Sequence, residues 1–218
     1  LVHSVCDISH EFTFYMDGRF HRQYLEGHGR DARNWGTLAE LDLSNTNLLV
    51  LVGGDSRLPY ESAAVDLVAG FVAGGGTALL MADGGDPMPP GAVIAERFGA
   101  SLTTVAARGP LRGVGEVADA EITFRRGTTL RLESATDWAP LVVDAEGRPV
   151  LAAGRHGRGH VIVGSRGLFG QRPDASDPIN AAWVTPLLLS RAASKPVDPD
   201  RPHRSTPAEL RRQAGPLT

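Results

Sequence analysis

The chain has 218 residues, of which 42% are hydrophobic, and its formal net charge is -3. A chain of this length can bury one good core, so we expect one domain with tails. The small net charge gives no electrostatic footprint for nucleic acid or for an anionic lipid surface. The single cysteine, Cys6, excludes an intramolecular disulfide and a cysteine-based zinc cluster. We expect no cofactor.

No apolar run approaches the roughly 20 residues that a membrane-spanning helix needs. We therefore expect no membrane span in this segment. The chain begins at Leu1 rather than at a methionine, which indicates a trimmed N-terminus. For that reason, the sequence does not indicate the cellular compartment of the protein.

The first half of the chain alternates between predicted strands and predicted helices. Continuous apolar runs are typical of parallel strands that are buried on both faces, and a 3.6-residue apolar period is typical of helices. The alternation predicts a parallel sheet flanked by helices, so the fold class is α/β. In chain order, we expect a strand over residues 1–7, a helix over 14–26, a strand over 48–52, a helix over 59–73, a strand over 77–81 and a short helix over 92–98.

From residue 101 to residue 164 the pattern changes to short alternating runs, separated by Gly, Pro and Asp. These runs predict strands, several of them antiparallel, at residues 121–124, 129–132, 141–143, 150–153 and 160–163, with a hairpin turn at residues 157–159. A closing helix is expected over residues 179–193, with Pro186 inside it.

The predicted α/β domain covers residues 1–195. Residues 196–218 are expected to form a Pro- and Arg-rich tail. Within this tail, Thr206 and Glu209 have the spacing of a capping box, and Pro207 is suited to the first helical position, so a short helix to about residue 213 is predicted.

Three stretches of the sequence carry a resemblance to a known family. The first strand leads into D-x-x-H-E, the middle stretch is LLVLVGGDSRLPYESAAVDLVAGFVAGGGTALLMAD, and PVLAAGRHGRGHVIVGSRGLF precedes the closing helix. Together they resemble the class I glutamine amidotransferase-like superfamily, in particular its non-catalytic branch. That branch includes bacterial domains of unknown function and the N-terminal domain of an intraflagellar transport subunit. The resemblance implies a flavodoxin-like, mostly parallel sheet with helices on both faces and a β-rich second half.

The resemblance also bears on catalysis. In active members of the superfamily, the glycine turn after the third strand helps to form the oxyanion hole, and the next elbow presents a cysteine beside a later His and Glu. Here the stretch LLMADGG supplies Asp83 in place of a thiol, and Cys6 lies near the first strand. A thiolate is needed to attack the glutamine amide. The resemblance therefore implies that the chain is not a glutaminase.

Polar residues and a glycine turn follow several of the predicted strands. Ligands of open α/β sheets bind outside the carboxyl ends of the strands, so these residues are expected to form a polar pocket for a cation or a sugar-like ligand. The alternative is that the carboxylates cap helix N-termini. The candidate ligand-binding residues are Asp7, His10, Glu11, Gly54, Asp55, Asp83 and Ser165.

Other motifs are less specific. His10, Glu11, His21 and His28 are residue types that suit zinc or iron, but the H-E-x-x-H spacing is absent and no metal site is predicted. The glycines at residues 53–54 and 74–76 match neither the Walker nor the dinucleotide fingerprint, which favours tight turns and close packing.

The sequence therefore predicts a non-catalytic amidotransferase-like module that binds a small molecule or a protein partner. No nucleic-acid partner is expected, and a homo-oligomer remains an alternative to a monomer. The alternative function is a hydrolase that uses a carboxylate and histidine cluster at the strand ends. In that case the acid, the base or the metal ligands would be Asp7, His10, Glu11 and Asp83. Geometry separates the two, because catalysis requires these side chains within hydrogen-bond reach of one cavity.

Overall fold

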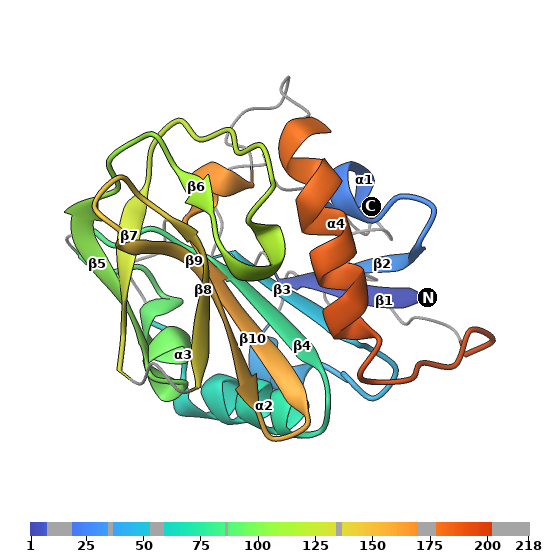
Figure 1. Ribbon diagram of the computed structural model, residues 1–218. Coiled ribbons are helices and arrows are strands. Elements are labelled where there is room, and N and C mark those ends of the chain that lie inside the picture. The colour runs from blue at the N-terminus through green and yellow to red at the C-terminus, as the bar shows by residue number, and fades with distance from the viewer. Residues whose placement is uncertain are drawn as a thin grey trace, which may run out of the picture.

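The computed structural model describes residues 1–7, 19–34, 37–52, 59–85, 87–133, 137–169 and 178–201. In these ranges the chain forms an eight-stranded mixed sheet, a separate two-stranded sheet and four α-helices (Figure 1). No helix in these ranges combines the length and the apolar character needed to cross a membrane.

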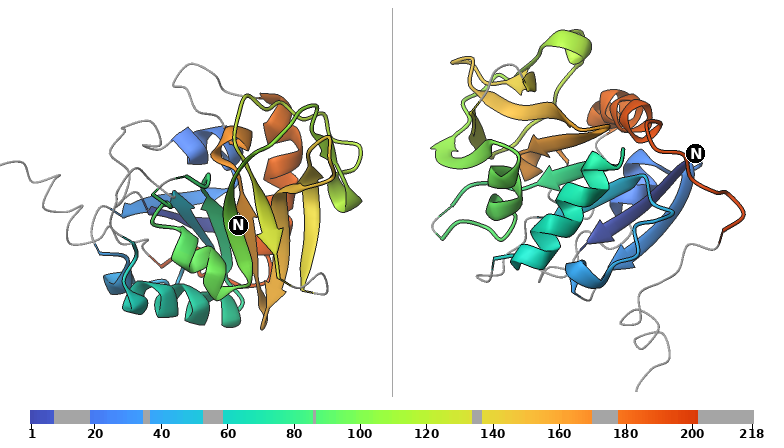
Figure 2. Two further views of the ribbon diagram at one scale, coloured as in Figure 1. Left: turned by 90° about the vertical axis from the view of Figure 1, so that its left-hand side faces the viewer. Right: turned by 90° about the horizontal axis from the view of Figure 1, so that it is seen from below.

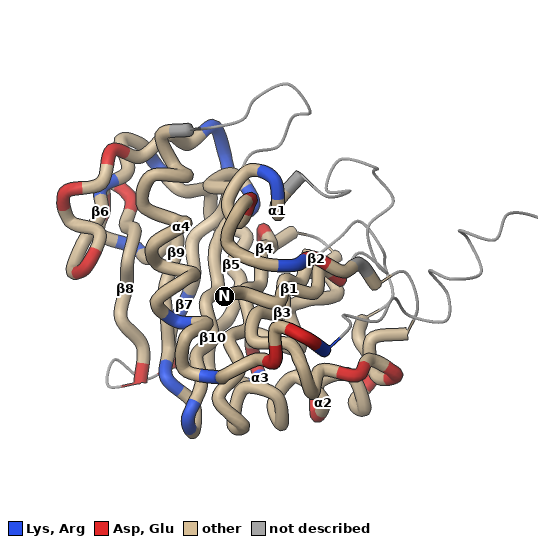
Figure 3. The backbone as a smooth tube through the Cα atoms, turned by 90° about the vertical axis from the view of Figure 1, so that its right-hand side faces the viewer, with Lys and Arg blue, Asp and Glu red and all other residues tan. Residues whose placement is uncertain are grey.

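The parallel part of the large sheet contains five of the described strands, in the order β2-β1-β3-β4-β10. Their bounds are β1 Val2–Asp7, β2 Gly29–Asn34, β3 Leu48–Val52, β4 Thr77–Met81 and β10 Gly159–Gly164. The neighbouring strands β3 and β4 pair from Leu48 opposite Thr77 to Val52 opposite Met81. This pairing confirms the predicted parallel sheet. The apolar sequences of β3 and β4 fit full burial. Figure 3 shows charged positions on the edge strand β2 instead.

Three antiparallel strands extend the sheet beyond β10, namely β9 (Pro149–His156), β8 (Trp138–Val143) and β6 (Arg112–Gly113). They confirm the β-rich second half. The hairpin predicted at residues 157–159 joins β9 to β10, where His156 pairs with Gly159. Gly157 has a φ of 61°, a conformation that glycine adopts without steric cost.

The two-stranded sheet pairs β5 (Ala100–Ala106) with β7 (Thr128–Leu132) in antiparallel register, with an irregularity between Leu102 and Ala106. The prediction of a strand at residues 121–124 is wrong, because this segment has no strand structure. The backbone of Thr123 has a side-chain partner instead, since its N–H donates to Asn180 Oδ1 at 3.0 Å and its carbonyl accepts from Asn180 Nδ2 at 2.8 Å.

The described helices are α1 (Arg19–Tyr24), α2 (Ser62–Ala73), α3 (Ala92–Arg97) and α4 (Pro178–Ala192). The last three lie where the sequence predicts helices. Residues 14–18 of the first predicted helix and the whole predicted helix of the tail lie outside the described residues. Residues 195–201 contact the loop before β3, where the Asn45 side chain bonds both the N–H and the carbonyl of Asp198 at 2.8 and 3.1 Å.

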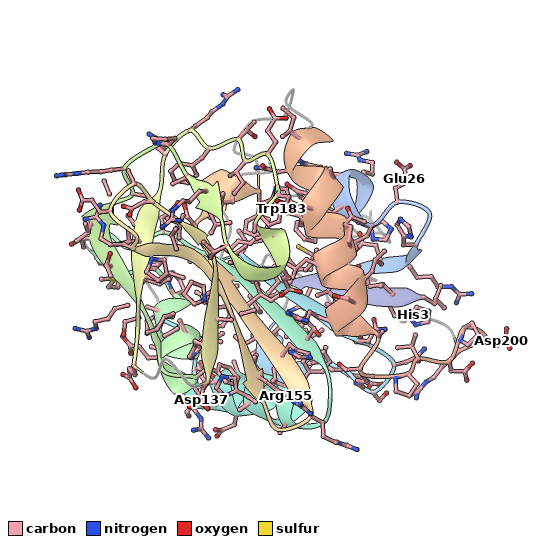
Figure 4. The ribbon with its side chains drawn as sticks, in the orientation of Figure 1. His3, Glu26, Asp137, Arg155, Trp183 and Asp200 are labelled. Carbon is pink, nitrogen blue, oxygen red and sulfur yellow. The ribbon has the colours of Figure 1, made fainter. Side chains whose placement is uncertain are left out.

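Successive side chains of β3 enter two different hydrophobic clusters. Leu48, Val50 and Val52 join the cluster that contains residues of α1 and α4, whereas Leu49 and Leu51 join the one that contains residues of α2 and α3. Figure 2 shows α2 lying along the parallel strands, and Figure 4 shows Trp183 on the α4 side of the molecule. Each fully buried aliphatic side chain of this kind stabilises the fold by about 1.5–3 kcal/mol. The sheet is therefore a rigid support for the loops at its carboxyl edge.

Candidate functional site

Asp7 lies at the carboxyl end of β1 and is fully buried. Its Oδ1 accepts a hydrogen bond from Asn34 Nδ2 at 2.7 Å, and its Oδ2 accepts one from the Tyr60 hydroxyl at 2.6 Å. A buried carboxylate is costly unless it is hydrogen-bonded. Asp7 thus joins the ends of β1 and β2 to the segment that precedes α2, and this bonding gives it a structural role.

Asp83 and Ser165 follow two neighbouring strands, β4 and β10, and the structure brings them together. The Ser165 hydroxyl donates to Asp83 Oδ1 at 2.5 Å, and the N–H of Thr128 donates to the same oxygen at 3.2 Å. The N–H of Gly84 donates to the Thr128 hydroxyl at 2.8 Å. Ser165 is fully buried and Asp83 is half-buried. This set is named here the Asp83 cluster: Asp83, Gly84, Thr128 and Ser165.

The chain passes closely over the Asp83 cluster at Gly127. A Cβ atom at this position would overlap Ser165 Oγ and would lie 2.8 Å from Asp83 Oδ1. Glycine is therefore required by close approach, and the start of β7 covers the serine. Neither Gly127 nor Thr128 was predicted from the sequence as a site residue.

Asp7 and the Asp83 cluster are separate in the sheet. The strand β3 lies between β1 and β4, and a strand spacing of about 4.8 Å places the two strand ends about 10 Å apart. Each carboxylate has its own hydrogen-bond partners. Among the residues that the structure describes, no three or more His, Cys, Asp or Glu side chains form a group that could hold a metal ion.

The remaining predicted site residues, His10, Glu11, Gly54 and Asp55, lie outside the described residues. They follow β1 and β3 directly in the sequence. Their convergence with Asp7 or with the Asp83 cluster stays a prediction.

The strand order has a switch point between β1 and β3. From β1 the chain continues to β2 on one side, and β3 lies on the other side. Ligands of open α/β sheets bind outside the carboxyl ends of the strands at such a point. Asp7 lies at the switch point, while the Asp83 cluster lies farther along the same edge.

Three other features singled out in the sequence, Cys6, His21 and the glycines after α2, lie against other parts of the fold. Cys6 is buried inside β1, within a hydrophobic cluster. His21 Nδ1 lies 3.3 Å from Ser4 Oγ. The glycines after α2 form a tight turn as predicted, with Gly75 at a φ of 106° and Gly76 packed against the ring of Phe71.

The backbone at Asp83 is not that of a nucleophile elbow. Such an elbow places its residue on a sharp, strained turn after a strand. In the described ranges, every residue with a positive φ is a glycine. Asp83 therefore has neither the strain nor the thiol of an elbow nucleophile.

No family model matches the sequence, and no curated protein matches it. Solved structures match the fold. The N-terminal domain of mmIFT52 is 15% identical, with a TM-score of 0.64 over 90% of this chain and 99% of that domain. A cytoplasmic protein from Salmonella typhimurium LT2 is 13% identical, with a TM-score of 0.59 over 88% of this chain and 99% of that one.

A ThuA-like protein from Parabacteroides merdae is 14% identical and has a TM-score of 0.51, with 94% of each chain covered. The β-galactosidase from Rahnella sp. R3 is 13% identical, with a TM-score of 0.59, but this chain spans only 31% of that enzyme. Such low identities show the fold alone. The chain therefore shares its fold with the mmIFT52 domain and with the ThuA-like protein.

Proposed function

We propose that the chain is a non-catalytic amidotransferase-like module, which binds a ligand or a protein partner at the carboxyl edge of its parallel strands. The observation that carries this proposal is the bonding of Asp83. Active members of the superfamily carry their cysteine at this turn, whereas here Asp83 Oδ1 accepts hydrogen bonds from Ser165 and Thr128. A carboxylate held in this way orders the turn rather than attacking a substrate.

The proposal includes a flavodoxin-like sheet with helices on both faces. Numbered in chain order, the five parallel strands have the flavodoxin order 2-1-3-4-5. The division of β3 side chains between a cluster with α1 and α4 and a cluster with α2 and α3 supports helices on both faces. In this arrangement the ligand site lies at the switch point beside Asp7.

The protein-binding form of the proposal is supported by the match to the mmIFT52 domain. That domain is the N-terminal part of a longer protein, and the match covers 99% of the domain. The β-galactosidase match carries no activity to this chain, because it covers a third of that enzyme at 13% identity.

The hydrolase alternative requires a general acid and a general base at one cavity. Asp7 is fully buried, and Asp83 follows a strand that β3 separates from β1. No described contact joins them, so no specific observation favours the hydrolase.

The first test is for glutamine chemistry. We expect no release of ammonia from glutamine, and no mass increase at Cys6 after treatment with a glutamine-analogue electrophile, because the thiol is buried in β1. Release of ammonia that disappears in Cys6→Ser would overturn the non-catalytic proposal.

The second test is for binding at the edge. NMR spectra of the labelled chain, recorded with a panel of small sugars and organic ions, should show shifts that concentrate on the ends of β1, β3, β4 and β10. Perturbations confined to other parts of the molecule would place the binding function elsewhere.

A further inference from the structure

A hollow of about 520 Å³ lies beside the C-terminal end of α2, at the amino ends of β3 and β4 and away from the Asp83 cluster. It is lined by the loop before β3, by one side of α2, and by Lys195, the only lysine in the sequence. Its volume is within the range of about 300–1,000 Å³ that small-molecule sites occupy.

Lys195 contributes a half-buried cation to this hollow. Its Nζ donates to the carbonyl of Leu43 at 2.7 Å and lies 4.8 Å from the centroid of the Phe71 ring. Burial lowers the pKa of Lys195, and the charge of Asp42 opposes this shift. Asp42 also pairs with Arg201 at 3.5 Å. The ammonium is thus incompletely compensated for its burial, and a bound anion would stabilise it.

The wall of the hollow formed by α2 is largely apolar, with the exposed Asp66 at its edge. Leu67 and Phe71 lie on this wall, together with Gly70. Glycine inside a helix is destabilising relative to alanine, and a Cβ at Gly70 would meet no atom within 4 Å. Packing therefore does not require glycine at this position, and its effect is to keep the hollow open.

We propose that the hollow binds a small organic monocarboxylate, with the carboxylate on Lys195 and an apolar body against Leu67 and Phe71. The rim disfavours ions of higher charge, because the exposed side chains of Asp42 and Asp66 also line the hollow. Figure 3 shows acidic positions close to α2. These carboxylates would repel a phosphate or a dicarboxylate more strongly than a monoanion. This site is independent of the function proposed for the opposite edge.

Phenylacetate is a suitable probe, and phenylacetamide is its uncharged match. Lysine labelled with a heavy carbon isotope at its ε position gives one lysine resonance, because Lys195 is the only lysine. Phenylacetate should shift this resonance in a saturable way and raise the pKa of Lys195, since a carboxylate favours the ammonium form. The amide should bind at least about tenfold more weakly.

Two variants test the geometry independently. Lys195→Gln removes the cation, whereas Gly70→Leu fills the hollow and leaves Lys195 in place; each should weaken phenylacetate binding at least about tenfold in calorimetry. Arg131→Gln makes the same charge change at an exposed position of β7 and should leave binding unchanged. Circular dichroism melting confirms that each variant is folded. Absence of a saturable shift, equal binding of the amide, or full binding by folded Lys195→Gln or Gly70→Leu would overturn the proposal.

Discussion

Asp144 is a buried carboxylate whose effect on stability depends on its hydrogen bonds. Burial acts to raise the pKa of Asp144, but hydrogen bonds from the Arg148 side chain and from the backbone N–H groups of Arg148, Arg108 and Glu146 outweigh it and lower the pKa to about 2. The Arg148 guanidinium donates to Asp144 Oδ2 at 2.6 and 2.9 Å. These bonds hold the turn between β8 and β9.

The first prediction concerns acid stability. Because the folded pKa lies below the ordinary value of 3.8, this stabilisation is fully present above about pH 4 and is lost as the pH falls toward 2. Asp144→Asn should lower the free energy of unfolding by about 1–3 kcal/mol at neutral pH. In urea unfolding curves, the difference between wild type and variant should shrink from about pH 5 to about pH 2.5. A difference that does not change with pH would contradict the assigned role.

His156 is a half-buried residue whose contribution to stability also decreases on acidification, but in a higher pH range than that of Asp144. Its ring centroid lies 4.9 Å from that of Phe98 and 5.7 Å from that of Trp138. Burial lowers the pKa of His156, and the charge of Asp137 opposes the shift. Its buried Nε2 has no hydrogen-bond partner in the described part of the chain. Asp137 and Arg155 lie close together at this end of β8 and β9 (Figure 4).

The second prediction follows from that lowered pKa. The fold favours the neutral ring, so the stability associated with His156 is fully present above the ordinary pKa of 6.5 and decreases as the pH falls below it. His156→Phe keeps an aromatic ring and removes the titration. Between about pH 7 and about pH 5, its melting temperature should fall less than that of the wild type. The exposed His28→Gln serves as a control, and identical pH slopes for His156→Phe and wild type would refute the prediction.

At the scale of elements, the periodicity of apolar residues predicts a strand or a helix where the element has a buried apolar face. The strands β3 and β4 are fully buried apolar runs, and α2 has a regular apolar face, so their sequences contain the signal. The strand β2 has the polar sequence GRDARN and lies at the edge of the sheet, so no apolar alternation marks it. The segment 121–124 alternates like a strand but bonds to a side chain of α4.

That side chain, Asn180, is fully buried and links three parts of the chain. Its Nδ2 donates to the carbonyls of Thr123 and Leu168, both at 2.8 Å, and its Oδ1 accepts from Thr123 N–H at 3.0 Å and from Trp183 Nε1 at 3.3 Å. A side-chain amide can accept a hydrogen bond from a backbone N–H and donate one to a backbone carbonyl. In a sheet, an adjacent strand would supply both of these hydrogen bonds. Asn180 therefore substitutes for a missing strand neighbour.

The third prediction is a large cost for removing this amide. Asn180→Ala leaves buried backbone groups without their partners and should lower the free energy of unfolding by at least about 2 kcal/mol. Ser190→Ala, on the same helix, removes only a hydroxyl bond to the carbonyl of Leu187 and should cost less than about 1 kcal/mol. Chemical unfolding measures both. A small effect of Asn180→Ala would mean that residues 121–124 find other partners.

At the scale of the whole molecule, the candidate site depends on strand order, which the sequence pattern does not contain. Asp83 and Ser165 are 82 residues apart and meet because β10 pairs with β4. The sequence predicts that both residues follow strands and lie at the same edge of the sheet, but it does not predict that their two strands are neighbours. The partners Asn34, Tyr60 and Thr128 were not predicted at all, because a hydrogen-bond partner is determined by tertiary packing rather than by local propensity.

The last prediction uses this separation of the two carboxylates. Asp7 and Asp83 follow strands that β3 separates, and each accepts hydrogen bonds from different partners. A divalent cation needs several oxygen ligands at about 2.3–2.6 Å for calcium, which strand ends about 10 Å apart do not supply together. The melting temperature should therefore not rise when calcium or magnesium is added to the wild type.

The substitutions at these two positions should differ in cost. Asp83→Asn retains an oxygen that can accept from Ser165 and Thr128, so it should change the free energy of unfolding by less than about 1 kcal/mol. Asp7→Asn replaces one of two buried acceptors by an NH₂ group that faces the Asn34 amide or the Tyr60 hydroxyl, and it should cost about 1–3 kcal/mol. A metal-dependent rise in melting temperature that Asp83→Asn abolishes would show that His10, Glu11 or Asp55 reaches the Asp83 cluster. The edge would then be a cation site, because carboxylates gathered closely require a cation or a proton to offset their repulsion.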